Sequence, residues 1–220
     1  MARFKQGIHG GFNGRVGNVV GSTWKGQGVM KIRPASVTNP NTEKQQDQRS
    51  RFGLMMRFLG THQKLIRIGF RPYAIRMTAF NAAMSRNMAE AIEGSSPDFS
   101  INYSMVSLSK GELPAITQAT VAYVSPVSVK LNWNNNSSYQ GAHSTDKLQV
   151  SIFDAESFKS QSFISCAARS ESSVTLALPA EWAGRFVDVF AFFLAEAGVG
   201  ASSTKMQVSD TVYAGGLALE

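Results

Sequence analysis

The sequence has few of the residues on which most metal and redox sites depend. Its single cysteine, Cys166, cannot form an internal disulfide, and its three histidines, His9, His62 and His143, lie far apart. No His-x-x-x-His or Cys-x-x-Cys spacing brings ligands together as a zinc site requires. We therefore predict no metal site, and we expect Cys166, within SFISCAA, to be a buried strand thiol.

Catalytic motifs are also missing. The sequence contains no Gly-x-Ser-x-Gly nucleophile turn. Asp154 and Glu156 flank an expected turn, where solvated side chains are the simplest interpretation. The glycine-rich stretch 10–34 superficially resembles a phosphate loop, but Ser22 and Thr23 lead into a β-prone run rather than a helix N-terminus. These observations predict a protein that is not an enzyme and binds no cofactor or small-molecule substrate.

Long apolar runs are absent as well. No window approaches 18 consecutive apolar residues, so no membrane span is expected. The N-terminal stretch MARFKQGIHGGF has charge but lacks the apolar run of a secretory signal. We therefore expect the protein to stay in the cytoplasm of the producing cell, or to be incorporated into a virion.

Acidic residues are scarce in the first half. Residues 1–100 contain 15 Lys and Arg against 5 Asp and Glu, whereas residues 101–220 contain 7 against 10. This asymmetry indicates that the basic half contacts an anionic partner, although solvated basic faces without a partner give the same composition. The residues expected to contact acidic protein or phosphate are Arg49, Arg51, Arg57, Lys64 and Arg67.

Three composition regimes predict an α+β chain. Val16–Trp24 and Val29–Arg33 flank a glycine-bearing turn and predict a β-hairpin. In it, Gly14, Gly17 and Gly21 leave gaps that either Trp24 or a neighbouring subunit is expected to fill. Residues 39–94 have helical patterns, with a third helix opened by Thr78 and ended by Gly94. The remainder has β-prone runs at 116–125, 127–134, 147–154, 160–168, 173–179, 185–195 and 203–213, which predict an immunoglobulin-like β-sandwich.

The first predicted helix has an unusually wide apolar arc. Phe52, Met55, Met56 and Leu59 recur at helical spacing, and with their neighbours they span roughly 200° of the helix surface. Such a helix must be covered on two sides, by its own domain or by another copy of the chain. Together with Trp24, these four residues are the predicted assembly interface. We predict two domains: a hairpin and basic helical assembly domain at 1–98, and the sandwich at 99–220.

Two resemblances add to this interpretation. Leu131-Asn132-Trp133 and the run Val187–Ala195, followed by Gly198-Val199-Gly200, resemble strands of a fibronectin type III module. The whole chain resembles a family of unknown function from Bacteroidota and their phages. The stretches that carry this likeness are Gly21-Ser22-Thr23-Trp24-Lys25-Gly26, Arg33-Pro34, Asn39-Pro40-x-Thr42, Ala79-Phe80-Asn81-x-x-Met84-Ser85 and Ser107-Leu108-Ser109-Lys110-Gly111. The segment from Asn39 to Phe52 is also similar to a device used in small phage structural proteins.

Together these features predict a structural or assembly protein, a component of a phage or phage-like particle. It would oligomerise through its N-terminal half and display the sandwich outward. Two alternatives stay open. One is a nucleic-acid-binding module that uses the basic helical half, where the arginines are interleaved with Phe52, Phe58, Phe70, Tyr73 and Phe80. The other is a cytosolic adaptor that binds a protein or sugar through the sandwich.

Overall fold

The chain divides into two compact units, Met1–Thr42 and Glu43–Glu220. The structure is a computed structural model that describes residues 2–4, 12–24, 26–36, 40–195 and 207–220. The predicted boundary between residues 98 and 99 therefore needs correction, because the helical segment belongs to the same unit as the sandwich.

The first unit contains a small antiparallel sheet. Its strands, in spatial order, are β1 (Ala2–Phe4), β4 (Gln27–Ile32), β3 (Val19–Trp24) and β2 (Gly14–Val16). Pairing of Trp24 with Gln27 and of Val19 with Ile32 confirms the predicted hairpin.

The glycines of this sheet do not all serve the predicted purpose. At Gly21 a Cβ atom would lie only 2.6 and 2.7 Å from two ring carbons of Phe12, so Phe12 rather than Trp24 fills that gap. Gly14 and Gly17 have open space beside them and φ values of 117° and 58°. Glycine is needed at these two positions for its backbone conformation.

The second unit contains the predicted sandwich. One sheet has the order β11 (Ser173–Ala177), β8 (Ser128–Asn134), β7 (Thr117–Ser125), and the other has the order β10 (Lys159–Phe163), β9 (Lys147–Asp154), β12 (Phe186–Leu194), β13 (Val212–Ala218). All strand pairs within these sheets are antiparallel. The buried side chains between the sheets include Leu131, Trp133, Val150, Trp182 and Val189.

The last strand lies later in the chain than predicted. It spans Val212–Ala218 instead of 203–213, and residues 203–206 fall outside the described part of the chain. Gly215 and Gly216 suggest a break, yet both lie within the strand. The Phe186 ring lies against the position that a Cβ of residue 216 would occupy, and Gly215 has a φ of 112°. Glycine at these positions therefore allows the strand to continue.

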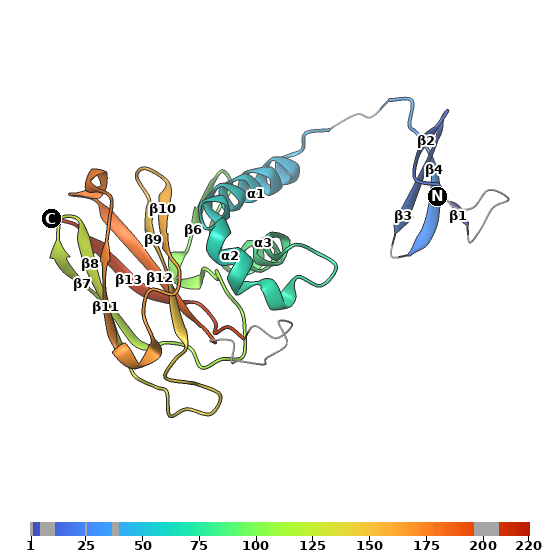
Figure 1. Cartoon of the computed structure of the whole chain (residues 1–220). Helices are drawn as coiled ribbons and strands as arrows, with labels where there is room; N and C mark the ends of the chain where they lie inside the picture. Colours follow the sequence, from blue (N-terminus) through green and yellow to red (C-terminus); the bar gives the residue numbers. More distant parts are fainter. Residues whose placement is uncertain (1, 5–11, 25, 37–39, 196–206) are drawn as a thin grey trace. The chain divides into compact units, whose positions relative to one another are not determined.

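Helices cover the outer face of the four-stranded sheet (Figure 1). They are α1 (Glu43–Thr61), α2 (Gln63–Gly69) and α3 (Ala79–Glu90), accompanied by the short helices η1 (Arg71–Tyr73), η2 (Tyr103–Met105), η3 (Arg169–Glu171) and η4 (Ala180–Trp182) elsewhere in the unit. A hairpin of β5 (Ile92–Ser95) and β6 (Asp98–Ile101) follows α3. Gly94, the predicted C-cap of the third helix, instead lies in β5 with a φ of 90°.

The two central strands explain why the helices cannot form a separate domain. Almost every residue of β9 and β12 is buried, so both of their faces are covered. Phe153 and Phe190 point away from the sandwich core into a second cluster that contains Phe58 of α1. The Phe58 ring lies 5.0 Å from the Phe153 ring and 6.2 Å from the Phe190 ring, both edge-on. The unit therefore has three layers: helices, four strands and three strands.

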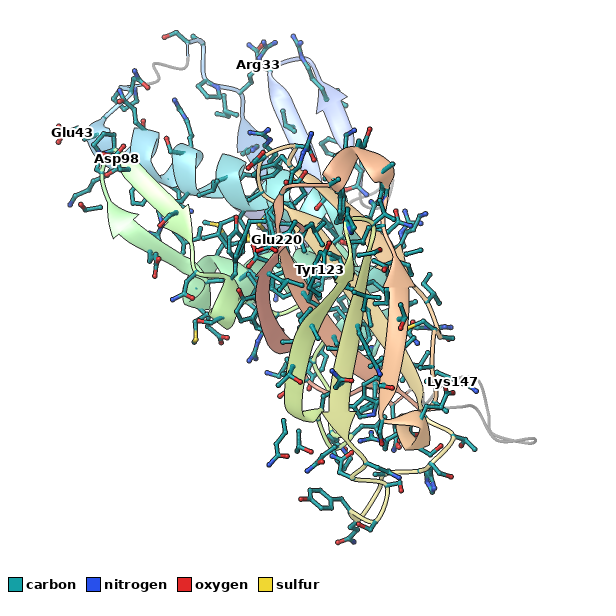
Figure 2. All side chains as sticks on the ribbon, turned by 90° about the vertical axis from the view of Figure 1, so that its left-hand side faces the viewer. Arg33, Glu43, Asp98, Tyr123, Lys147 and Glu220 are labelled. Carbon is teal, nitrogen blue, oxygen red and sulfur yellow. The ribbon has the colours of Figure 1, made fainter. Side chains whose placement is uncertain are left out.

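Chain segments far apart in sequence meet at both ends of this unit. The Tyr123 hydroxyl donates a 2.8 Å hydrogen bond to the carbonyl of Glu220, and the two residues lie together in Figure 2, with Lys147 at the opposite end of the sandwich. Glu43 and Asp98 lie together where α1 begins beside the β5–β6 hairpin (Figure 2). There the Ser96 hydroxyl donates to the Asp47 carboxylate at 2.5 Å.

Truncation tests this division of the chain. A chain that begins at Glu43 is expected to unfold in a single transition at the midpoint of the main transition of the full-length protein, because the second unit keeps all three layers. The measurement is thermal unfolding followed by circular dichroism. A chain that begins at Phe99 is the comparison, and we expect it to aggregate because Phe153 and Phe190 lose their cover. A stable, soluble 99–220 fragment would contradict the three-layer architecture.

Candidate functional site

The described residues hold no group of three His, Cys, Asp or Glu side chains that could bind a metal ion. Cys166 is half-buried, and its thiol donates to the Leu148 carbonyl at 3.5 Å. Burial raises the pKa of Cys166 to about 11. At neutral pH it is therefore a protonated thiol, which is a weak nucleophile.

A buried arginine joins the loops at one end of the sandwich. Arg169 is fully buried and donates to the Asp146 carboxylate at 3.0 Å, to the Asn136 side-chain oxygen at 2.5 Å and to the Pro114 carbonyl at 3.0 Å. Its guanidinium also lies 3.8 Å from the centre of the Phe193 ring. These contacts occupy the guanidinium, so Arg169 has a structural role.

A buried histidine lies between the helices and the sheet. His62 is fully buried, and its Nδ1 lies 3.0 Å from the Phe58 carbonyl oxygen, which can only accept a hydrogen bond. The Thr61 hydroxyl also lies 2.8 Å from Nδ1, whereas Nε2 has no hydrogen-bond partner among the described residues. Burial lowers the pKa of His62 to about 4, against a partly compensating effect of the Phe58 carbonyl. The imidazole is therefore neutral at physiological pH.

Two aspartate carboxylates lie in the protein interior, although the sequence patterns did not predict this. Asp154 is buried, contrary to the expectation that it is solvated, whereas Glu156 is exposed as expected. Asp154 accepts hydrogen bonds from Arg185 and Ser157, each at 2.6 Å. Burial raises the pKa of Asp154, but hydrogen bonds from Ser157, Arg185 and the backbone outweigh this and lower it overall.

The second carboxylate lies on β12. Asp188 accepts a 2.6 Å hydrogen bond from the Tyr213 hydroxyl. Burial raises the pKa of Asp188, and the bond from Tyr213 opposes this only in part. Burial also raises the pKa of Tyr103, with a further contribution from the Asp188 charge. Both carboxylates accept hydrogen bonds that join neighbouring segments of the sandwich.

The predicted assembly interface is divided by the fold. Trp24 is 58% exposed in the first unit, and Phe52 and Met56 are 45% and 41% exposed on α1. Met55 and Leu59 are fully buried in the core of their own unit, so they are removed from the expected interface. The correction follows from the rotation of α1, which turns Met55, Phe58 and Leu59 inward and leaves the Phe52 and Met56 side of the arc outside.

The predicted cationic surface is divided as well. The Arg57 guanidinium lies 3.9 Å from the centre of the Phe158 ring, and that of Arg51 lies 5.7 Å from the centre of the Phe99 ring. Both arginines therefore help to fasten α1 within its own unit. Lys64 and Arg67 are exposed on α2, and Arg49 is exposed on α1.

A shallow groove lies between α3 and the segment that joins α2 to α3. It has a volume of about 350 Å³ and is lined by Phe70, Tyr73, Met77, Ala82, Ser85, Arg86, Glu90 and Lys110. All of residues 71–78 are exposed, although they include Tyr73, Ile75 and Met77. This apolar surface was not predicted. The alternation of large apolar residues at 73, 75 and 77 outside any regular element is the sequence signal for it.

Comparison with known proteins identifies the family. Residues 11–214 match a family of unknown function, DUF6266. The chain belongs to this family. The match covers nearly the whole DUF6266 chain and confirms its predicted resemblance to a family of unknown function. No curated protein matches the DUF6266 chain. Among the described residues, no helix is both long enough and apolar enough to cross a bilayer.

Solved structures give a likeness to the sandwich. The fibronectin type III domain of the human collagen alpha-1(XX) chain is 16% identical with a TM-score of 0.31, and the match covers 55% of the DUF6266 chain and 85% of that domain. The corresponding domain of human contactin 1 is 18% identical with a TM-score of 0.31, and the match covers 55% and 88%.

Proposed function

We propose that this protein is a non-enzymatic structural or assembly protein, a component of a phage or phage-like particle, and that it self-associates through its N-terminal sheet. The observation that carries this proposal is a row of β-branched side chains across three strands. Val16 pairs with Val19, and Val19 pairs with Ile32, so the three side chains lie on one face of the sheet. Val16 is 65% exposed and Ile32 is 78% exposed.

The size of the N-terminal unit supports the need for a partner. Among its described side chains and glycines, only Gly21 and Val29 are buried. A chain of about 40 residues rarely buries enough apolar surface to be stable alone, and a sheet must cover one face. We assign a second copy of the chain as the cover, because a flat row of β-branched residues is self-complementary about a two-fold axis.

The remainder of the chain supports a scaffolding role. The described polar clusters are occupied by internal hydrogen bonds, as at Arg169 and Asp154. The helical layer covers one outer face of the sandwich, so the outer face of β7, β8 and β11 is the surface that the assembled protein would display. The likeness of the segment from Asn39 to Phe52 to a device used in small phage structural proteins supports a role in such a particle.

Light scattering tests self-association. The full-length protein is expected to elute as an oligomer in size-exclusion chromatography with light scattering. The double variant Val16→Lys with Ile32→Lys is expected to elute as a monomer, because two charges in the apolar row would have to be desolvated in the interface.

The matched control is Ser22→Lys, which adds a charge at an exposed position on the opposite face of the same sheet. It should remain an oligomer. A wild-type protein that is monomeric at high concentration would overturn the proposal, and so would a double variant that elutes as the wild type does.

A further inference from the structure

The groove beside α3 combines exposed apolar groups with an apolar floor. Tyr73, Ile75 and Met77 occupy every second position of one short segment, and they are 41%, 74% and 50% exposed. Such exposure is unusual for large apolar side chains that lie so close together in sequence. Phe70 and Ala82 line the groove beneath them. The volume of about 350 Å³ is at the lower end of the range for ligand-binding clefts and is sufficient for one or two side chains of a partner.

The charged residues that line this groove are two cations, Arg86 and Lys110, and one anion, Glu90, so their net charge is positive. Residues 63–89 contain Lys64, Arg67, Arg71, Arg76 and Arg86 but no Asp or Glu. The only acid that lines the groove, Glu90, is paired with Arg86 at 3.2 Å. Lys110 reaches the same groove from the segment after β6, with its ammonium 5.3 Å from the centre of the Tyr73 ring. The rim therefore presents cations around an apolar centre.

We propose that this groove docks an acidic peptide segment of a partner protein, in which carboxylates flank an apolar side chain. The apolar side chain would pack against Tyr73 and Met77. The carboxylates would meet Lys110, which lines the groove, and Arg76, which is exposed on the segment that borders it. Charge complementarity selects an anionic occupant. The groove residues Met77 and Ala82 favour a peptide over a nucleic acid, because aliphatic side chains offer no ring on which bases stack. The inference goes beyond self-association, which uses the other unit of the chain.

Peptide titration provides the test. The probe is a short fluorescein-labelled peptide in which glutamates flank a Leu-Phe pair, and binding to the full-length protein is followed by fluorescence anisotropy. Added salt should weaken the binding, because the ionic contacts are exposed. The double variant Arg76→Glu with Lys110→Glu should weaken it about tenfold, because two attractive ionic contacts become repulsive. The variant Met77→Ser should weaken it through the apolar contact.

Three comparisons keep the result interpretable. Lys130→Glu reverses an exposed charge on β8, outside the groove, and should bind the probe as the wild type does. Arg76, Met77 and Lys130 are exposed and Lys110 is half-buried, and unchanged thermal unfolding would show that each variant is folded. Equal binding of a peptide with glutamine in place of glutamate would overturn the proposal. Groove variants that bind the probe as the wild type does would also overturn it. So would groove variants that lose binding to single-stranded DNA but keep binding to the peptide.

Discussion

Lowering the pH from 6.5 to about 4 is expected to remove about 3 kcal/mol of stability through His62 alone. In the folded protein the His62 imidazole is neutral and its pKa is about 4, because burial opposes its charge. In the unfolded chain its pKa returns to the ordinary value of 6.5. Between these values the unfolded state binds more protons, so stability falls as pH falls. At 1.36 kcal/mol for each pH unit, the difference between 6.5 and about 4 corresponds to about 3 kcal/mol.

The physical cause of the lowered pKa is the environment of Nε2 of His62. The His62 ring lies 4.5 Å from the Phe58 ring, 5.5 Å from the Phe153 ring and 5.9 Å from the Phe190 ring. A proton on Nε2 would place a charge among these rings without a hydrogen-bond acceptor in the described part of the chain. The helices and the four-stranded sheet meet at this cluster, so its disruption is expected to unfold the whole second unit.

The measurement is urea unfolding across this pH range for the wild type and for His62→Asn. The asparagine amide can still donate to the Phe58 carbonyl but does not titrate, so the variant is less stable but its pH profile is flatter. The raised pKa of Asp188 has the opposite effect, because this group increases the stability of the folded protein as pH falls. Both proteins contain Asp188, so the difference between their profiles isolates His62.

The exposed histidine provides the control. His143 is exposed in the loop before β9, and His143→Asn should keep the steep wild-type profile. Parallel profiles for the wild type and His62→Asn would show that burial of His62 does not control acid stability. The test is specific to one side chain because the remaining histidine, His9, is unchanged in all three proteins.

The sandwich was predictable because its strands show the pattern that a half-buried sheet produces. In β8 the sequence SVKLNWN alternates between buried Val129, Leu131 and Trp133 and more exposed neighbours. The hairpin of β3 and β4 was predictable from its glycine-bearing turn. In both cases the pattern is local, so neighbouring residues are enough to reveal it.

The sequence also contains a signal for the three-layer arrangement, and this signal is not an alternating pattern. The β12 sequence FVDVFAFFL is almost continuously apolar, which is typical of a strand covered on both faces. A sandwich facing solvent would have polar residues at Phe190 and Phe192. Their apolar character already indicates that another layer covers the sheet, and the helices are the adjacent segment that can supply it.

The orientation of α1 and the groove could not be read in the same way. The arc around Phe52 to Leu59 is wide enough for several orientations, and only contact with Phe153 and Phe190 turns Phe58 inward and Met56 outward. Likewise, the cations of the groove come from α3 and from Lys110, which lie apart in sequence. Their convergence is a property of the tertiary fold, so local sequence patterns do not reveal it.

Replacing Arg169 by methionine is expected to lower the free energy of unfolding by about 3–5 kcal/mol, the usual cost of removing one partner from a buried ion pair. The side chains of Arg169 and Asp146 are 0% and 1% exposed, and their charged groups are 3.0 Å apart. Without Arg169, the Asp146 charge would remain buried. The acceptors on Asn136 and Pro114 would also lose a donor.

The exposed ion pair of the same sandwich is the matched control. The charged groups of Lys159 and Glu181 lie at a similar distance, 3.2 Å, but their side chains are 61% and 59% exposed. Because water screens such a pair, Lys159→Met is expected to cost less than about 1 kcal/mol. Chemical unfolding, followed by the fluorescence of the buried Trp133 and Trp182, measures both variants in the same way. A similar small loss for Arg169→Met would contradict a buried, tightly coupled cluster.

A second substitution distinguishes charge from packing. If the loss arises from an uncompensated buried carboxylate, Arg169→Met combined with Asp146→Asn should be more stable than Arg169→Met alone, because the buried charge is gone. The asparagine oxygen can still accept the hydrogen bond that the His143 backbone amide donates to Asp146 at 2.9 Å. If the loss arises only from the missing guanidinium that packs on Phe193, the second substitution would restore nothing. Partial recovery would therefore assign Arg169 the role of neutralising Asp146, a pairing that holds together loops from 23 residues apart in the chain.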